Sequence, residues 1–348
     1  MKHGRIVVSW LGWLRQKTLA SKKGYRDMAH NLEMINGEAS YFGVREPAWH
    51  KLGVTIPEYA TAEEALELAK LNWVPRAIPL IAEIEGIKYP VKERQLIIRD
   101  NPAGMFEPPI ILGDVGRVYR VIPIHELVAL AEVLAEVSGA VWSSGGVLGQ
   151  GEKVFLSLEV KTPLMLANGD VIKRYFLIFL SNDGSGSAIL KPTLTRAVCQ
   201  NTLNLALRGA ENEYRIKHAT SYKARMEEVV RALKVEESYV DSFKVRADEL
   251  LGRTMSVDDL DGFFKAVVGI GDGEALDDVH GKTLARYEDI WDTYNLPTQD
   301  NARGNAWGAL NAVVEYADFK AYKSDSGLAT DLIRGNALKD KALELLSA

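Results

Sequence analysis

The chain has a single cysteine, Cys199, among its 348 residues. One cysteine excludes an internal disulfide and any zinc site built from several thiolates. It fits a protein of a reducing compartment, and we expect a cytoplasmic location. None of the histidines pairs with another at a metal-binding spacing, so we expect no metal or cofactor. No stretch approaches the about 18 continuous apolar residues of a membrane span, so the sequence predicts no membrane partner.

What is present is the composition of an ordinary globular protein, 47% hydrophobic and 26% charged. The length favours two domains. We expect a basic N-terminal extension over 1–27, a mixed domain over 28–220 and a helical region over 221–348. The extension has seven Lys/Arg and one Asp around an apolar run, 6–14. Three interpretations stay open: a stretch outside the native protein, which would start at Met28, a basic arm, or an export signal.

Hydrophobic periodicity and turn residues predict the elements of the mixed domain. Residues 28–57 look irregular, a capping box begins a short helix at Thr61, and Asn101–Gly116 looks like a loop. The predicted strands are 73–84 and 87–99, joined at Glu85-Gly86, then 117–122, 140–148, 153–161, 171–182 and a possible 186–190. The predicted helices are 124–138 and 193–207.

Beyond residue 221 the pattern is helical, and this half is acidic, with 22 Asp/Glu against 12 Lys/Arg from residue 235 onward. The predicted helices are 224–251, 257–268, 281–294, 303–322 and 329–346. Sequential strands with tight turns favour antiparallel pairing. The sequence therefore predicts an α+β fold, an antiparallel meander flanked by helices and followed by a mostly helical C-terminal region.

One basic segment stands out in this acidic chain. Lys191–Lys234 holds nine Lys/Arg and four Glu, against a formal net charge of −5 for the whole protein. Such a segment favours a polyanionic partner. The candidate nucleic-acid contacts are Lys173, Arg174, Lys191, Arg196, Arg208, Arg215, Lys217, Lys223, Arg225 and Tyr222. Tyr175, Phe176 and Tyr214 could add base stacking. The alternative is a solvated helix face, in which Glu227 and Glu228 pair with Arg231.

Three other features have a structural and a functional interpretation. Cys199 with His218 could be a nucleophile pair, but a buried small hydrophobe is favoured. Backbone amides of the loop Ser181–Ser187 could bind an anion, but a turn is favoured. Residues Asp300–Trp307 open a helix, and Trp307 with Asn311, Glu315 and Asp318 could line a site, although core packing and capping are favoured.

Three motifs in order resemble the "phage/plasmid-like protein" family. The first is Met28-Ala-His-Asn-Leu-Glu, followed by Glu46-Pro47-Ala48-Trp49-His50-Lys51-Leu52-Gly53. The second is Arg196-Ala-Val-Cys-Gln-Asn-Thr-Leu203, and the third is Asn305-Ala-Trp-Gly-Ala-Leu-Asn-Ala-Val-Val-Glu-Tyr-Ala-Asp318. The resemblance implies a phage, prophage or plasmid setting in a bacterial host. It implies no established activity and no accepted catalytic residues.

We therefore expect a single-stranded DNA-binding protein that acts as a homo-oligomer and promotes strand annealing without bond chemistry. A meander flanked by helices with a basic surface is also the plan of ring-forming annealing proteins, which is an analogy of fold alone. The alternative is a metal-dependent enzyme acting on nucleic acid, with Glu159, Asp170 and Asp183 holding Mg²⁺. A third hypothesis is a host-interaction or anti-defence protein that uses its acidic helical half.

Overall fold

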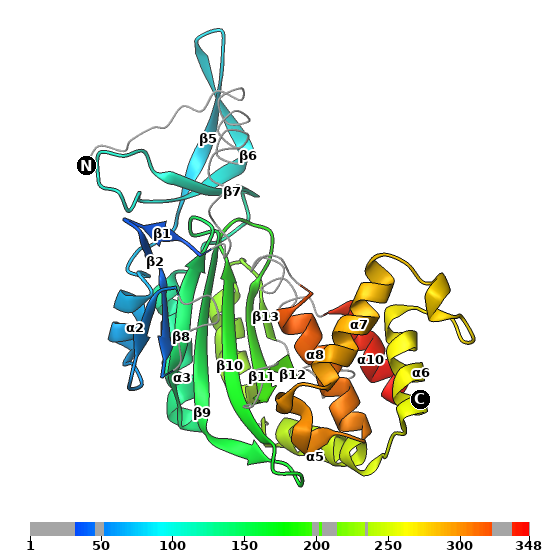
Figure 1. The fold of residues 1–348 in the computed structure, drawn as a ribbon. Coiled ribbons are helices and arrows are strands. Elements are labelled where there is room, and N and C mark those ends of the chain that lie inside the picture. Colours follow the sequence, from blue (N-terminus) through cyan, green and yellow to red (C-terminus); the bar gives the residue numbers. More distant parts are fainter. Residues whose placement is uncertain are drawn as a thin grey trace. The chain divides into compact units, whose positions relative to one another are not determined.

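A computed structural model describes residues 32–45, 52–196, 202–203, 214–233, 236–321 and 336–347. The chain forms two compact units (Figure 1). Unit 1 comprises Met1–Leu158, Leu177–Leu190 and Tyr214–Arg231, and unit 2 comprises Glu159–Phe176, Lys191–Glu213 and Ala232–Ala348. The chain passes between the units within strands, so the units are not successive stretches of sequence. The domain boundary expected near residue 220 stays a prediction.

The fold is α+β, as the sequence predicts. The strands are β1 (Met34–Ile35), β2 (Glu38–Ala39), β3 (Tyr41–Val44), β4 (Val54–Ile56), β5 (Arg76–Ile84), β6 (Ile87–Arg99), β7 (Ile110–Gly116), β8 (Ala140–Leu148), β9 (Lys153–Met165), β10 (Val171–Ser181), β11 (Ala188–Arg196), β12 (Thr202–Leu203) and β13 (Tyr214–Ile216). The helices are α2 (Ala62–Leu68), α3 (Ile124–Ser138), α4 (Tyr222–Leu233), α5 (Glu236–Gly252), α6 (Val257–Val268), α7 (Lys282–Tyr294), α8 (Ala306–Phe319) and α10 (Ala337–Ser347), with 3-10 turns η2 (Leu276–Asp278) and η3 (Pro297–Ala302).

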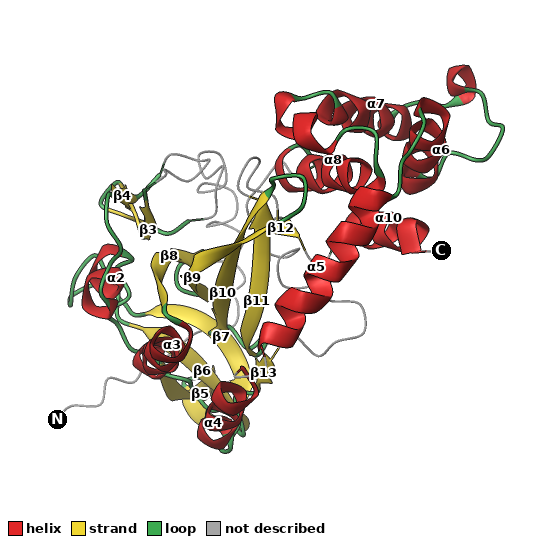
Figure 2. Cartoon of the chain, turned by 90° about the horizontal axis from the view of Figure 1, so that it is seen from below, coloured by secondary structure: helices red, strands yellow, loops and turns green. Residues whose placement is uncertain are grey.

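The largest sheet is built on a meander. Its order is β12-β11-β10-β9-β8-β3-β4, and β13 also pairs with β11. The β3–β4 pair is parallel, whereas β3–β8, β11–β12 and β11–β13 are antiparallel. The helices α3 and α4 lie side by side in unit 1 (Figure 2), joined by a hydrogen bond from the Tyr222 hydroxyl to Glu126. The meander flanked by helices is therefore confirmed, with α4 as the second helix.

The second sheet, β5-β6-β7, begins with the predicted hairpin. Glu85 and Gly86 both have positive φ, 52° and 78°, as a two-residue turn between twisted strands requires. Strand β7 ends where Gly116 pairs with Arg94. From there to the turn, the hairpin consists of β5 and β6 only (Figure 1, cyan). The cross-strand pairs Ala82–Tyr89 and Ile84–Ile87 give it an exposed apolar face, and Ile84 and Ile87 are 60% and 58% exposed.

Four sequence predictions are wrong in detail. The strand expected at 117–122 is instead β7, inside the stretch expected to be loop. The helix expected over 193–207 is strand where the structure describes it, in β11 and β12, because the β-branched Thr193 and Thr195 favour the sheet. The helix expected over 224–251 is divided into α4 and α5. Residues expected to be irregular before Pro57 contribute β1–β4.

A buried ion pair within unit 1 joins the end of β6 to Glu33, the residue just before β1. Arg99 and Glu33 are 1% and 4% exposed, and Arg99 Nη1 lies 2.9 Å from Glu33 Oε1. The Ser40 hydroxyl donates to Glu33 Oε2 at 2.9 Å, and the Arg99 guanidinium lies 4.2 Å from the centroid of the Trp73 ring. A Cβ at Gly151 would lie 2.8 Å from Arg99 Nη1, so this glycine leaves the space that the arginine fills.

Unit 2 is a helical core packed around α8. Its buried apolar residues come from α5, α6, α7, α8 and α10, with contributions from Leu166, Ile172 and Leu194. The caps that the sequence predicts are present, since Asn305 accepts from the Gly308 amide and begins α8. A Cβ at Gly308 would lie 1.9 Å from the Ala302 carbonyl oxygen, so only glycine allows this approach.

The C-terminal motif is structural, as favoured above. Trp307 and Asn311 are fully buried, and Trp307 Nε1 donates to Asp170 Oδ2 at 2.7 Å. Glu315 accepts from the Thr298 hydroxyl at 3.0 Å and from Gln299 Nε2 at 2.7 Å. In the described part of the chain, no helix is both long and apolar enough to cross a bilayer.

Candidate nucleic-acid interface

Two segments far apart in sequence place exposed cations next to each other in unit 1. The Arg120 amide donates to the His218 carbonyl oxygen at 3.0 Å, and His218 Nδ1 lies 3.0 Å from the Arg120 carbonyl oxygen. These contacts fix segment 117–120 beside segment 217–218. We call the exposed cations of 117–120, of 215–217 and of the start of α4 the basic strip: Arg117, Arg120, Arg215, Lys217, Lys223 and Arg225.

Carboxylates contact part of the basic strip but leave its cations at the surface. Lys223 Nζ lies 3.0 Å from Glu126 Oε1, and Arg225 Nη1 lies 2.5 Å from Glu228. The side chains of Lys223 and Arg225 are 70% and 46% exposed, so solvent screens both ion pairs and each carboxylate can exchange for a phosphate. Within the described residues, Lys217 makes no ion pair with a carboxylate.

The structure brings together half of the predicted contacts. Arg215, Lys217, Tyr222, Lys223 and Arg225 belong to unit 1 and to one continuous stretch of chain. Tyr222 is partly buried by its bond to Glu126, which leaves its ring little freedom to stack on a base. The expected pairing of Arg231 lies outside the described side chains, and Glu228 pairs with Arg225 instead.

The remaining predicted contacts belong to unit 2 or lie outside the described residues. Lys191 is buried at 7% exposure, because its position in β11 points it away from water, so its assignment to a surface contact is wrong. Arg174 donates to the Thr162 carbonyl oxygen at 3.0 Å, and Lys173 lies beside it on β10. Phe176, expected to stack, is 1% exposed. The Arg196 side chain, Arg208, Cys199 and residues 1–27 lie outside the described set.

A pocket opens within the basic strip. It has a volume of about 360 Å³, and it is lined by Gly116, Val118, Tyr119, Gly184, Ser185, Gly186, Ser187, Lys217 and His218. One wall is therefore the glycine- and serine-rich loop that the sequence singled out, and the opposite wall comes from the basic segment. No pattern in the sequence places this loop next to these basic residues.

A half-buried lysine holds the loop in place. Lys153 Nζ lies 2.9 Å from Ser181 Oγ and 2.8 Å from Asp183 Oδ1, and it also contacts Ser185 Oγ. Burial acts to raise the pKa of Asp183, but hydrogen bonds from Lys153 and Ser185 outweigh it and hold that pKa below its usual value. Asp183 therefore stays ionised and neutralises Lys153, and Lys217 is the cation that the pocket presents to a ligand.

Two stacked rings form the aromatic wall of the pocket. The Tyr119 and His218 rings are nearly parallel, at 10°, with centroids 4.3 Å apart. Burial lowers the pKa of His218, and contacts with the Arg120 and Ser181 carbonyl oxygens oppose this only in part. The imidazole is therefore neutral at pH 7. Its Nε2 atom is enclosed and makes no well-aligned hydrogen bond.

Two of the three carboxylates that the enzyme hypothesis requires have other partners. Asp170 is fully buried and accepts from Trp307 and Asn301, and Asp183 is paired with Lys153. The described residues contain no group of three His, Cys, Asp or Glu side chains placed to hold a metal ion.

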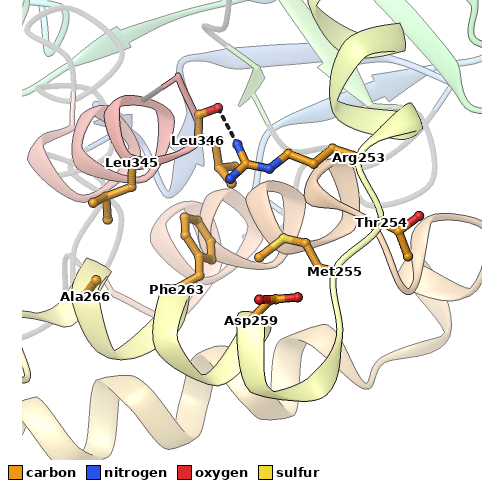
Figure 3. A pocket seen from close by; sticks show the side chains of 8 residues that line it. All are labelled: Arg253, Thr254, Met255, Asp259, Phe263, Ala266, Leu345 and Leu346. Atoms are coloured by element: carbon orange, nitrogen blue, oxygen red, sulfur yellow. Dashed lines mark hydrogen bonds between the residues drawn. The ribbon is translucent and has the colours of Figure 1, made fainter. Parts of the chain in front are cut away.

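A second pocket, of about 340 Å³, lies in unit 2 between α6 and α10 (Figure 3). Its two charged side chains have structural partners. Arg253 Nη1 donates to the Leu346 carbonyl oxygen at 3.1 Å, and Asp259 accepts from Ser256 in a capping box. The two charged side chains therefore serve to cap the C-terminal end of α10 and the N-terminal end of α6.

A family model described as "Domain of unknown function (DUF932)" matches residues 111–337. No curated protein and no solved structure matches the chain. The matched residues include the central and C-terminal motifs, the meander and the basic strip, whereas the N-terminal motif precedes them. Since the match spans more than half of the chain, this protein belongs to the DUF932 family.

Proposed function

We propose that the protein binds single-stranded DNA through the basic strip and promotes annealing of complementary strands as a homo-oligomer, in the cytoplasm of a bacterial host that carries a phage or plasmid. The observation that supports it is the pair of contacts between Arg120 and His218, which brings together two distant segments that carry cations. Cations that neutralise the phosphates of a strand displace the counterions condensed on it, which favours binding without base specificity.

The test compares salt dependence of binding to a labelled single strand of about 20 nucleotides. For the double variant Arg117→Ala with Lys217→Ala, we expect affinity to fall roughly three- to tenfold at about 50 mM salt, and the slope of log affinity against log salt to decrease by about 1.4. Both residues are exposed, so folding is unaffected.

The matched control removes two exposed cations from the hairpin of the same unit, Lys88→Ala with Lys92→Ala. We expect wild-type affinity for this variant. Equal losses in the two double variants would show that only net charge matters, and absence of wild-type binding at low salt would end the proposal. Light scattering with and without the strand tests the oligomer.

A further inference from the structure

The pocket within the basic strip has the dimensions of a site for one nucleotide. Its volume of about 360 Å³ falls in the range of small-ligand sites, and it far exceeds what a lone phosphate would fill. We infer that this pocket binds a single nucleoside 5′-phosphate unit, with the base against the Tyr119–His218 wall and the phosphate at Lys217. The inference rests on the proposed function only where the nucleotide is taken to be part of a strand.

The aromatic wall supplies the contact for a base. Because Tyr119 and His218 already stack on each other and the imidazole is neutral, the wall is rigid and loses little entropy when a base packs on it. Val118, 81% exposed, adds apolar surface beside the rings. A contact of this kind contributes on the order of 1–3 kcal/mol per base and accepts every base.

The opposite wall supplies the contact for a phosphate. Lys217 is exposed, and Ser185 and Ser187 of the loop line the same space. Lys153 holds the loop through three side-chain contacts, so the wall is ordered before a ligand binds. The cations Arg117 and Arg120 flank Val118 and Tyr119 in the sequence, so a strand can continue past the pocket.

A base in this pocket must be unpaired, because stacking on the Tyr119–His218 wall and pairing within a duplex exclude each other in a site of this volume. The pocket therefore gives the basic strip a preference for single strands that cations alone do not provide.

The experiment measures binding of dAMP, deoxyadenosine and inorganic phosphate to the full chain by calorimetry. We expect dAMP to bind with a Kd on the order of 1 mM, and more tightly than either fragment. Gly116→Phe fills the pocket from its edge. A Cβ at Gly116 meets nothing within 4 Å, and its backbone conformation is an ordinary one. We expect this variant to lose dAMP binding at least tenfold.

The matched control is Gly262→Phe in α6, where a Cβ also meets nothing within 4 Å. We expect it to bind dAMP as the wild type does. Equal binding of phosphate and dAMP, or an unchanged Kd in Gly116→Phe, would overturn the inference. If dAMP binds and the oligonucleotide does not, the pocket stands and the proposed function falls. If the oligonucleotide binds and dAMP does not, the proposed function stands and the nucleotide pocket falls.

Discussion

Replacement of Arg99 by alanine is expected to lower the free energy of unfolding by about 3–5 kcal/mol, because it leaves the Glu33 carboxylate buried without its cation. Glu33 is 4% exposed, and its remaining hydrogen bond, from Ser40, does not neutralise it. Part of the loss comes from the Trp73 ring, which packs on the guanidinium. Urea denaturation followed by tryptophan fluorescence measures the effect.

The pH dependence of this loss separates charge burial from lost packing. Burial raises the pKa of Glu33 above its usual value, although Arg99 opposes the shift. A carboxyl with a raised pKa binds its proton more tightly in the folded state, so stability falls as pH rises from the unfolded value through the folded one. Without Arg99 the pKa rises further. The variant should therefore lose more stability near pH 8 than near pH 5.

Two companion variants complete this test. Arg99→Lys keeps the charge but not the planar contact with Trp73, so we expect a smaller loss. Glu33→Gln combined with Arg99→Met removes both charges, and its loss should be smaller than the sum of the single losses. A loss in Arg99→Ala that is the same at both pH values would show that packing, and not the buried charge, sets the effect.

Local signals in the sequence were sufficient for elements that local chemistry decides. The capping box at Thr61, the turn at Glu85-Gly86 and the amphipathic pattern of α3 each depend on residues within one or two turns of chain. Helix α6 was predicted with its observed bounds for the same reason.

Predictions failed where distant contacts decide the structure. Residues 117–122 alternate like a strand, but their amides donate to the carbonyl oxygens of Glu93, Gly116 and His218 and form no ladder. The proline residues just before β7 favour a loop, but β7 forms because it pairs with β6. Lys191 carried the charge of a surface residue, but the sheet places it inside.

The candidate site shows the same limit. The cations of 215–225 were visible as a cluster, since they are neighbours in sequence. Arg120 joins them through a contact that spans 98 positions, and the loop at 184–187 faces them only because β13 pairs with β11. No sequence pattern records such proximity, so the pocket required the structure.

Replacement of Asp170 by alanine is expected to destabilise unit 2 by about 3–5 kcal/mol, because each donor left buried without an acceptor costs about 1–3 kcal/mol. Asp170 is fully buried and accepts from Asn301 Nδ2 at 2.5 Å, from Trp307 Nε1 at 2.7 Å and from Asn168 Nδ2 at 3.1 Å. It thereby fixes the β9–β10 turn to the start of α8. Urea denaturation followed by circular dichroism at the helical band measures the loss.

The double-mutant cycle with Trp307→Phe tests whether the two residues act as a pair. Phenylalanine keeps most of the ring in the core and removes the indole N–H, so Trp307→Phe alone leaves one oxygen of Asp170 short of a donor. In the combined variant that donor is already gone, and we expect a loss smaller than the sum by about 1–2 kcal/mol. Additive losses would show that Asp170 stabilises unit 2 by other contacts.

Asp170→Asn distinguishes this structural role from the metal-binding role that the enzyme hypothesis needs. Asparagine has nearly the same shape, but its NH2 group replaces one of the two oxygens and faces the donor of either Trp307 or Asn301, so we expect a loss of about 1–3 kcal/mol. A metal ligand would behave in the opposite way, since removal of a buried charge without its metal leaves stability unchanged or increased. A stability equal to or above that of the wild type in Asp170→Asn would therefore contradict the structural assignment and reopen the metal hypothesis.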